Sequence, residues 1–191
     1  MNLVLASTSA YRRVLLERLG LPFEVTAPHV DESPLPGEPP EAVAERLARA
    51  KALSVAPRFP DSLIIGSDQA AVCDGELLGK PGTHDNAVRQ LRKVSGKETV
   101  FHTALCVHAS GTGVTKLRSV PYRVRFRKLN DELIKRYLER ERPYDCAGSA
   151  KAEGLGIALI ERMEGDDPTA LMGLPLIALV SLLQELGQDV L

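Results

Sequence analysis

The sequence predicts an α/β protein built on a mixed β-sheet that is flanked by helices. Strand and helix patterns follow one another along 191 residues without strict alternation, which argues against a doubly wound parallel sheet. Asp74-Gly75 between apolar residues indicates a β-hairpin, and the stretches 98–108 and 114–126 indicate two long strands joined by a glycine turn. We therefore expect one domain over residues 1–191 around one substantial core.

Local patterns place the elements of the N-terminal half. The first helix has apolar positions at Val14, Leu15 and Leu19 and can end near Gly20. The stretch 31–40 holds four prolines and one glycine, which predicts a surface loop. The expected elements are strands at residues 3–6, 23–26 and 63–68 and helices at about residues 10–20 and 41–55.

Capping residues and turns delimit the elements of the C-terminal half. Thr83 can cap a helix that ends before Gly96, Asn130 can cap the next helix, and Leu174-Pro175 opens the last one. The expected elements are a hairpin of residues 71–73 and 77–78, strands at 98–108, 114–126 and 156–162, and helices at about 83–94, 130–141 and 174–187.

Bulk composition indicates an ordinary globular protein from a reducing compartment. The chain has 44% hydrophobic and 26% charged residues, outside the ranges of disordered and fibrous proteins. Cys73, Cys106 and Cys146 are odd in number and widely spaced, which favours reduced thiols. The N-terminus lacks the basic region of a signal peptide, and no apolar run approaches the ~20 residues of a membrane span. We therefore expect a cytoplasmic protein without a membrane partner.

The charge balance limits the classes of ligand. With 24 basic and 25 acidic residues the net charge is −1, which argues against a dedicated nucleic-acid binder. A small anionic ligand needs only a local basic cluster, which the total charge does not exclude.

The first strand–turn–helix unit contains candidate phosphate ligands. Ser7, Thr8, Ser9, Arg12 and Arg13 place hydroxyls and guanidinium groups beside the free backbone amides of a helix N-terminus. The alternative is an ordinary capped amphipathic helix whose arginines point to solvent.

Acidic residues in two places are candidate metal ligands. Asp31 and Glu32 lie in the proline-rich loop, and Asp68 ends an apolar strand. Polar residues at strand ends of α/β proteins often line a crevice, and carboxylates there suit Mg²⁺. Alternatively, Asp31 and Glu32 are solvated loop charges and Asp68 caps the following turn.

Two lysines can neutralise phosphate oxygens. Lys51 lies near the end of a helix, and Lys80, in Gly79-Lys80-Pro81, follows the hairpin. A single lysine on a helix is more often simply solvated. Histidine and cysteine spacings typical of zinc, a Gly-x-Ser-x-Gly elbow and a Walker A loop are all missing, which disfavours those sites.

Several short segments combine these candidates with glycines and small residues. They are residues 5–13, Val30-Asp31-Glu32, Ala50-Lys51-Ala52, residues 65–69, Gly79-Lys80-Pro81, Ala147-Gly148-Ser149, Gly154-Leu155-Gly156 and residues 173–176. In this order, and over almost the whole chain, they resemble the Maf family of nucleoside triphosphate pyrophosphatases.

Within that family the chain resembles the N7-methyl-GTP pyrophosphatase (YceF-type) branch. That branch has an aromatic residue, Gln and Glu where Tyr11, Gln69 and Glu153 stand, whereas the dTTP/UTP branch typically has Arg, Thr and Gln. N7-methylguanine is a cationic purine, which favours stacking on an aromatic face. A carboxylate can also accept hydrogen bonds from guanine N1–H and its amine. The alternative is that Tyr11 packs on its helix while Gln69 and Glu153 face solvent.

The sequence departs from the family pattern in its first loop. Ala10 replaces a proline that is usual in the family, and Tyr11 replaces the tryptophan expected in this branch. Tyrosine offers a smaller stacking surface, so we expect a weaker preference for the methylated base.

The resemblance implies an elongated sheet with a central cleft between two lobes, as in Maf and ITPase-like folds, and a homodimer. It also implies a mechanism in which Asp68 accepts a proton from the water that attacks the α-phosphorus. Glu32 and Asp68 would hold a divalent metal, Mg²⁺ first and Mn²⁺ as the alternative. The phosphate ligands would be Ser7, Arg12, Arg13, Lys51 and Lys80.

Other functions remain open at this point. A dTTP/UTP or broad-specificity nucleotide pyrophosphatase would use the same chemistry on another base. A non-catalytic nucleotide-binding regulator of septum formation would not need Glu32, Lys51, Asp68 and Lys80 together. A nucleic-acid-binding module is disfavoured by the charge and by only 4% aromatic residues.

Overall fold

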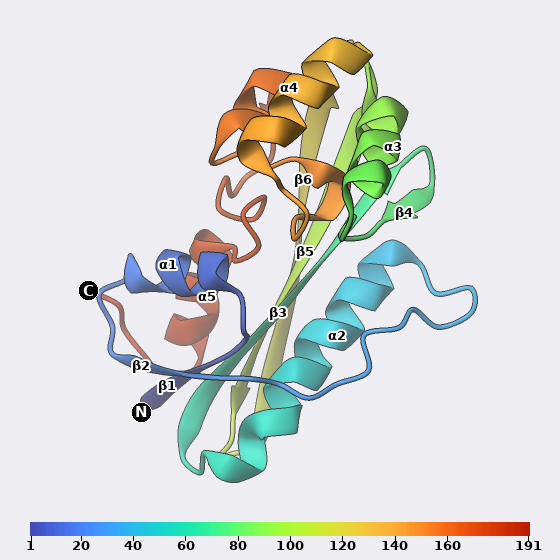
Figure 1. Cartoon of the computed structure of the whole chain (residues 1–191). Helices are drawn as coiled ribbons and strands as arrows, with labels where there is room; N and C mark the ends of the chain where they lie inside the picture. Colours follow the sequence, from blue (N-terminus) through green and yellow to red (C-terminus); the bar gives the residue numbers. More distant parts are fainter. The chain divides into compact units, whose positions relative to one another are not determined.

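The computed structural model describes residues 1–191 and has a mixed α/β architecture (Figure 1). The strands are β1 (Asn2–Ala6), β2 (Phe23–Thr26), β3 (Ser62–Cys73), β4 (Glu76–Leu78), β5 (Glu98–Ala109), β6 (Val114–Phe126) and β7 (Ile160–Glu164). The helices are α1 (Ala10–Glu17), α2 (Pro40–Val55), α3 (His84–Val94), α4 (Asp131–Glu141) and α5 (Leu176–Glu185).

The sheet has seven strands and combines parallel with antiparallel pairs. Its order is β2-β1-β3-β5-β6-β7, and β4 pairs with β3 outside this path. Strand β1 runs parallel to both β2 and β3, whereas β4 is antiparallel to β3 and β7 is antiparallel to β6. The expected mixed sheet with flanking helices is therefore confirmed.

The chain forms two compact units. The first unit comprises Met1–Gln69, His102–Val120 and Asp167–Leu191, and the second comprises Ala70–Phe101 and Pro121–Asp166. Strands β3, β5 and β6 contribute residues to both units. The single domain over residues 1–191 and the central cleft stay predictions.

In the first unit, helices cover both faces of the strands. Helices α1 and α5 share one hydrophobic core with β1, β3 and β5, and α2 packs on the other face (Figure 1). The alternation of side chains along a strand explains this division, because successive residues point to opposite faces. The core residues are Leu3, Leu5, Leu15, Leu16, Leu63, Ile65, Leu105, Val107, Ala109, Leu174, Leu176, Leu179, Leu182 and Leu183.

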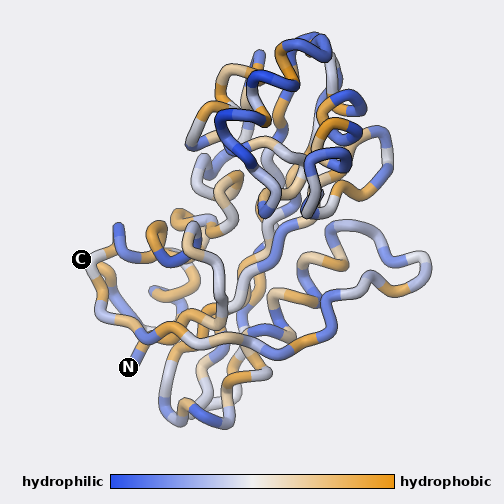
Figure 2. The backbone as a smooth tube through the Cα atoms, viewed as in Figure 1, coloured by the Kyte–Doolittle hydropathy of each residue, from blue (hydrophilic) through white to orange (hydrophobic).

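In the second unit, α3 and α4 lie beside each other on the strands, and each buries one face. Hydrophilic and hydrophobic residues alternate along both helices (Figure 2). Thr83 Oγ1 accepts a hydrogen bond from Asn86 N, and Asn130 Oδ1 accepts one from Leu133 N at 2.8 Å, so both expected caps are confirmed. The buried residues of the two helices are Ala87, Leu91, Val94, Ile134, Tyr137 and Leu138.

The expected hairpin is confirmed, because Asp74 (φ 52°) and Gly75 (φ 76°) both have the positive φ of a type I′ turn. The expected end of the preceding strand is wrong, since β3 continues without a break from Ser62 to Cys73. Asp68 therefore lies inside a strand and does not cap a turn.

Two further expectations are wrong in detail. The stretch 156–162 is not one strand, because Leu155–Leu159 forms a 3-10 helix and β7 starts at Ile160. Periodicity alone does not show whether a short apolar run forms a strand or a helix. In α1 the inward positions are Leu15 and Leu16, whereas Val14 is 56% exposed.

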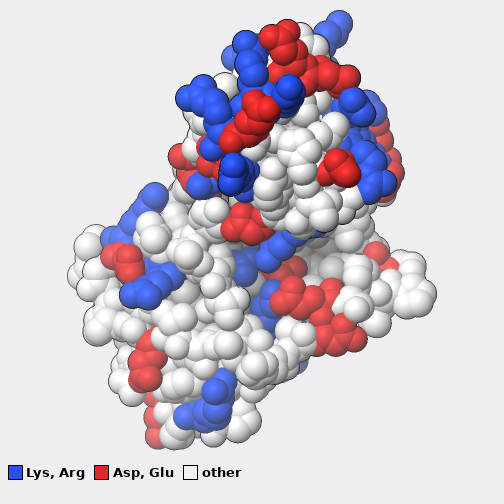
Figure 3. All heavy atoms as spheres, in the orientation of Figure 1, with Lys and Arg blue, Asp and Glu red and all other residues white.

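Charged side chains of both signs lie next to each other on the face drawn in Figure 3, especially over α3 and α4. None of the helices combines the length with the apolar character that a membrane-spanning segment requires.

Candidate functional site

Gly66 allows helix α2 to approach strand β3 closely in the first unit. A Cβ atom on Gly66 would lie 2.1 Å from Ala48 O and 2.8 Å from Ala52 N, so any other residue would displace the helix. Ala48 and Ala52 are small and completely buried. Because residues two apart on a strand share a face, Asp68 points to the same helix as Gly66.

Lys51 of α2 lies between two carboxylates on this face. Its Nζ donates to Asp68 Oδ1 at 2.6 Å and lies 2.9 Å from Glu32 Oε1. The Lys51 side chain is 6% exposed and that of Asp68 12%, whereas that of Glu32 is 58% exposed. The alternative of a solvated lysine is therefore excluded. Neither the Lys51 ammonium nor the Asp68 carboxylate is fully hydrated, and the attraction between them offsets the cost of this desolvation.

Ser7 and Arg12 contact each other at the start of α1. Ser9 caps this helix by accepting a hydrogen bond from Arg12 N at 3.4 Å. Ser7 Oγ accepts hydrogen bonds from Ser9 N at 3.1 Å and from Arg12 Nη1 at 3.5 Å. Arg12 Nε donates to Gly173 O at 2.8 Å. The guanidinium of Arg12 is thus directed into the protein, not to solvent.

Electrostatic interactions connect Arg12 with Asp68 and Glu32, the two carboxylates that contact Lys51. Burial lowers the pKa of the Arg12 guanidinium, while Asp68 and then Glu32 act in the opposite direction. We call Arg12, Glu32, Lys51 and Asp68 the Lys51 cluster. It combines two cations, which attract phosphate, with two carboxylates, which can accept protons or bind a cation.

The proline-rich loop that carries Glu32 is anchored to α2. Arg46 Nε and Nη2 donate to Glu38 Oε1 at 2.7 Å and Oε2 at 2.8 Å, and Nη2 also donates to Ser33 O at 3.1 Å. The hydrogen bonds from Arg46, followed by one from Leu35 N–H, lower the pKa of Glu38 to about 2. The Arg46 guanidinium therefore holds the chain directly after Glu32.

Gln69 points to the face of β3 opposite to Asp68. Its Nε2 donates to Thr103 Oγ1 at 2.9 Å and to the carbonyls of Ala170 and Leu171 at 3.0 and 3.1 Å. The amide hydrogens are used inside the protein, so Oε1 is the atom that Gln69 can offer to a ligand. The alternative in which Gln69 faces solvent is excluded, because these partners bury part of the side chain.

Asp167, which was not among the predicted site residues, organises the loop that Gln69 contacts. Asp167 Oδ1 accepts hydrogen bonds from Thr169 N and Oγ1 at 3.0 and 2.6 Å, and Oδ2 accepts one from Ile177 N at 2.8 Å. Thr169 Oγ1 in turn accepts one from Leu176 N at 2.7 Å. These bonds satisfy the free amides at the start of α5. The available signal was the polar Asp-Pro-Thr sequence shortly before a helix.

The remaining candidates of α1 differ in their exposure. Tyr11 is half-buried, which a stacking residue requires on one side. Arg13 is exposed, and its Nε lies 3.1 Å from Glu17 Oε1 one turn further along the helix. Arg13 is thus engaged at the surface of α1 and is not joined to the Lys51 cluster by a contact. Its role in phosphate binding stays a prediction.

Lys80 and Glu153 belong to the second unit, and both are exposed. Gln90 of α3 supports the segment before Lys80. Gln90 Nε2 donates to Gly79 O at 2.9 Å, and Gln90 Oε1 accepts a hydrogen bond from Ser149 Oγ at 2.6 Å. Gln90, which was not among the predicted site residues, links the Gly79-Lys80-Pro81 segment to the buried turn at Ser149.

The donor set for a divalent cation consists of Glu32 and Asp68. Each carboxylate contacts Lys51 Nζ with one oxygen, at 2.9 and 2.6 Å, so a divalent cation would use carboxylate oxygens that Lys51 does not contact. No group of three or more His, Cys, Asp or Glu side chains is arranged to hold a metal ion. Mg²⁺ typically takes one or two carboxylates and completes its shell with water and substrate phosphates, so the two residues fit this ion.

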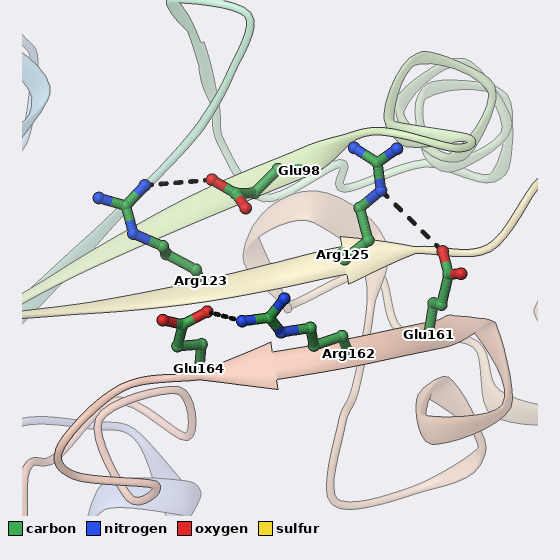
Figure 4. A pocket seen from close by; sticks show the side chains of 6 residues that line it. All are labelled: Glu98, Arg123, Arg125, Glu161, Arg162 and Glu164. Carbon is green, nitrogen blue, oxygen red and sulfur yellow. Dashed lines mark hydrogen bonds and ion pairs between the residues drawn. The ribbon is translucent and has the colours of Figure 1, made fainter.

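One hollow in the second unit does not contain any predicted site residue. It has a volume of about 590 Å³ and is lined by three arginines and three glutamates (Figure 4). Each guanidinium is already paired, as in Arg123 with Glu98 at 3.1 Å, so the hollow offers no excess charge to a nucleotide. Its residues are Glu98, Arg123, Arg125, Glu161, Arg162 and Glu164.

Comparison with known proteins adds a family and close relatives. A family model described as Maf-like protein matches residues 2–186. A curated protein of Methylobacillus flagellatus named 7-methyl-GTP pyrophosphatase is 59% identical over 99% of this chain and 98% of its own length. A Nitrosospira multiformis protein of the same name is 57% identical over 99% and 96%. The Staphylococcus aureus Ham1 structure matches with a TM-score of 0.48 at 15% identity over 66% and 72% of the chains, a likeness too low to carry an argument.

Proposed function

The chain belongs to the Maf family, and on that premise we propose that it hydrolyses N7-methyl-GTP to the monophosphate and pyrophosphate. The names of relatives at 57–59% identity over nearly the full length support this substrate. The observation that carries the chemistry is the Lys51 cluster, in which a buried ammonium joins Asp68 to Glu32. We place the enzyme in the cytoplasm, with a nucleotide as its partner.

The cations of the cluster bind and orient the triphosphate. Arg12 is fixed by Gly173 O and Ser7, so its guanidinium needs little reorganisation to receive phosphate oxygens. Lys51 is held by two carboxylates and acts as a nearby point charge. Preorganised cations of this kind stabilise the charge that develops in phosphoryl transfer.

Asp68 is the proposed base. A water oxygen attacks the α-phosphorus, the bond from this phosphorus to the oxygen bridging to the β-phosphorus breaks, and pyrophosphate leaves. Asp68 accepts one proton of the water. A divalent cation held by Glu32 and Asp68, Mg²⁺ or alternatively Mn²⁺, would polarise the phosphate and acidify this water. Because Lys51 holds Asp68 in place, the carboxylate keeps one orientation in the site.

Base recognition is assigned to Tyr11, Gln69 and Glu153. A half-buried aromatic ring favours stacking on the cationic purine. Gln69 offers an acceptor whose direction is fixed by three hydrogen bonds of its amide nitrogen. The exposed Glu153 carboxylate can accept hydrogen bonds from guanine N1–H and its amine.

The test is pyrophosphate release in the presence of Mg²⁺ from N7-methyl-GTP, GTP, dTTP and UTP. We expect the highest kcat/KM for N7-methyl-GTP and a loss of about 10³-fold in kcat for Asp68→Asn. Glu164→Gln, which changes a surface acid of the second unit, serves as the control. Preference for dTTP or UTP would contradict the base assignment, and full activity of Asp68→Asn would contradict the proposed base. No release from any substrate would favour the non-catalytic regulator.

A further inference from the structure

A short segment of the second unit, residues 151–155, carries Glu153 and is held on both sides by Glu141. Glu141 is the last residue of α4, and its side chain is only 11% exposed. Its Oε2 accepts a hydrogen bond from Leu155 N at 2.7 Å, and its Oε1 lies 3.2 Å from Lys151 Nζ. One carboxylate therefore contacts the Lys151 side chain two residues before Glu153 and the Leu155 backbone two residues after it.

The backbone of this segment packs directly against that carboxylate. A Cβ atom on Gly154 would lie 2.7 and 2.8 Å from the two Glu141 oxygens, and one on Gly156 would lie 2.5 Å from Lys151 O. Lys151 O accepts hydrogen bonds from the N–H groups of both glycines at 3.0 Å. The segment is a compact turn in which a side chain at Gly156 would meet the Lys151 backbone and one at Gly154 would displace the Glu141 carboxylate.

Tyr137 provides a third point of attachment. It lies one helical turn before Glu141 on the same face of α4, and its hydroxyl accepts a hydrogen bond from Lys151 N at 3.0 Å. Burial raises the pKa of Tyr137, so the phenol stays protonated, and the Glu141 carboxylate raises the pKa of Lys151. The ion pair between Glu141 and Lys151 thus persists at neutral pH.

We infer that Glu141 is a positioning residue for base recognition, which fixes the Glu153 carboxylate in the direction needed to bind the guanine edge. This inference rests on the proposed function. Glu141 acts through the backbone of residues 151–155, and Glu153 makes the contact with the base.

The geometry of the contact explains why such support matters. Two parallel hydrogen bonds from N1–H and the amine require both carboxylate oxygens at the right distance and angle. An exposed glutamate on an unsupported turn would sample many positions, and a misplacement of about 1 Å can cost as much as 10²-fold in rate. A pyrimidine triphosphate does not offer this donor pair and should not depend on the support.

The experiment compares kcat/KM for N7-methyl-GTP with kcat/KM for dTTP in Glu141→Ala, Glu141→Gln, Glu153→Ala and Glu141→Ala/Glu153→Ala. Glu141→Ala should reduce the preference for N7-methyl-GTP about tenfold, mainly through KM. Glu141→Gln keeps an acceptor for Leu155 N–H and should lose less. Glu139→Ala, on the same helix and 57% exposed, is the matched control and should keep the preference.

The double variant separates positioning from folding. With Glu153 absent, Glu141→Ala should not reduce the preference further, because the two residues act as one unit. A lower melting temperature with unchanged preference in Glu141→Ala would overturn the inference and leave a purely structural role. If Glu141→Ala does not fold, Glu141→Gln and Lys151→Met carry the same comparison. A wild-type protein without preference for N7-methyl-GTP would instead overturn the base assignment of the proposed function, and the inference with it.

Discussion

Lys51 Nζ and Asp68 Oδ1 lie 2.6 Å apart, although 17 residues and a change from helix to strand separate them along the chain. Neither charge could be buried alone, because desolvation of an unpaired ion costs several kcal/mol. Each charge therefore offsets the desolvation cost of the other. The hydrogen bond from Lys51 also fixes the orientation of the Asp68 carboxylate, the proposed base, and uses only its Oδ1 atom.

Replacing Lys51 by Met should destabilise the protein and abolish pyrophosphate release. The variant leaves the Asp68 carboxylate mostly buried without its ammonium partner, and we expect a loss of about 3 kcal/mol in the free energy of unfolding. Urea unfolding at neutral pH measures this loss. Lys97→Met removes an exposed surface pair with Asp74 and should leave the free energy of unfolding nearly unchanged. Equal losses in the two variants would contradict the buried role of Lys51.

Replacing Gly66 by Ala should displace α2. The added methyl group would lie 2.1 Å from Ala48 O, and backbone atoms cannot give way as a side chain can. Overpacking typically costs about 1–3 kcal/mol, and we expect the upper end together with reduced activity. Differential scanning calorimetry measures the stability loss, and the pyrophosphate-release assay measures the activity. In Gly79→Ala no atom lies within 4 Å of the new Cβ, so its melting temperature should match the wild type.

Replacing Asp167 by Asn should loosen the start of α5. The carboxylate accepts hydrogen bonds from Thr169 and Ile177 with its two oxygens, and an amide provides only one acceptor oxygen. Loss of such a cap costs about 1–2 kcal/mol, which corresponds to a decrease of about 5 °C in melting temperature for a chain of this size. Asp166→Asn, at the exposed neighbouring position, is the control. A similar decrease in both variants would argue against the cap.

Glu38 should make stability depend on pH in the acid range. Its pKa in the folded protein is lowered to about 2 by hydrogen bonds from Arg46, below its ordinary value of 4.5. A lowered pKa contributes stability that is fully present above pH 4.5 and is lost as the pH falls through about 2. The stability difference between the wild type and Glu38→Gln should therefore be constant from pH 7 to about 5 and shrink below 4.5.

Urea midpoints at pH 7, 5, 4 and 3 measure this difference. A Glu38→Gln difference that is independent of pH down to 3 would show that Arg46 does not hold the carboxylate.

Local patterns predicted most elements, because caps and turns depend on neighbouring residues. The Asp74-Gly75 turn and the Thr83 and Asn130 caps are examples. The predicted end of this strand at residue 68 was wrong because Ser67, Asp68 and Gln69 are polar, although they lie inside β3. Their partners, Gly173, Lys51 and Ala170, are 106, 17 and 101 residues away, so no local window contains the compensation.

The candidate site shows the same limit. Arg12 and Arg13 are equivalent by spacing, but one helical step turns Arg12 to Gly173 O and Arg13 to Glu17 at the surface. Gln90 and Glu141 act on loops elsewhere in the chain, which a helical pattern does not reveal. Gly66 carried a usable signal, since glycine within an apolar strand often marks a close backbone approach.

The opposite directions of Asp68 and Gln69 on β3 have an evolutionary consequence. One peptide bond separates the residue proposed for chemistry from the residue proposed for base choice, and the pleat of the strand sends them to different neighbours. Mutations at position 69 and in the loop that it contacts can therefore explore new nucleobases while the reaction itself is conserved. A lineage of such proteins could diversify its substrates without reinventing its catalyst.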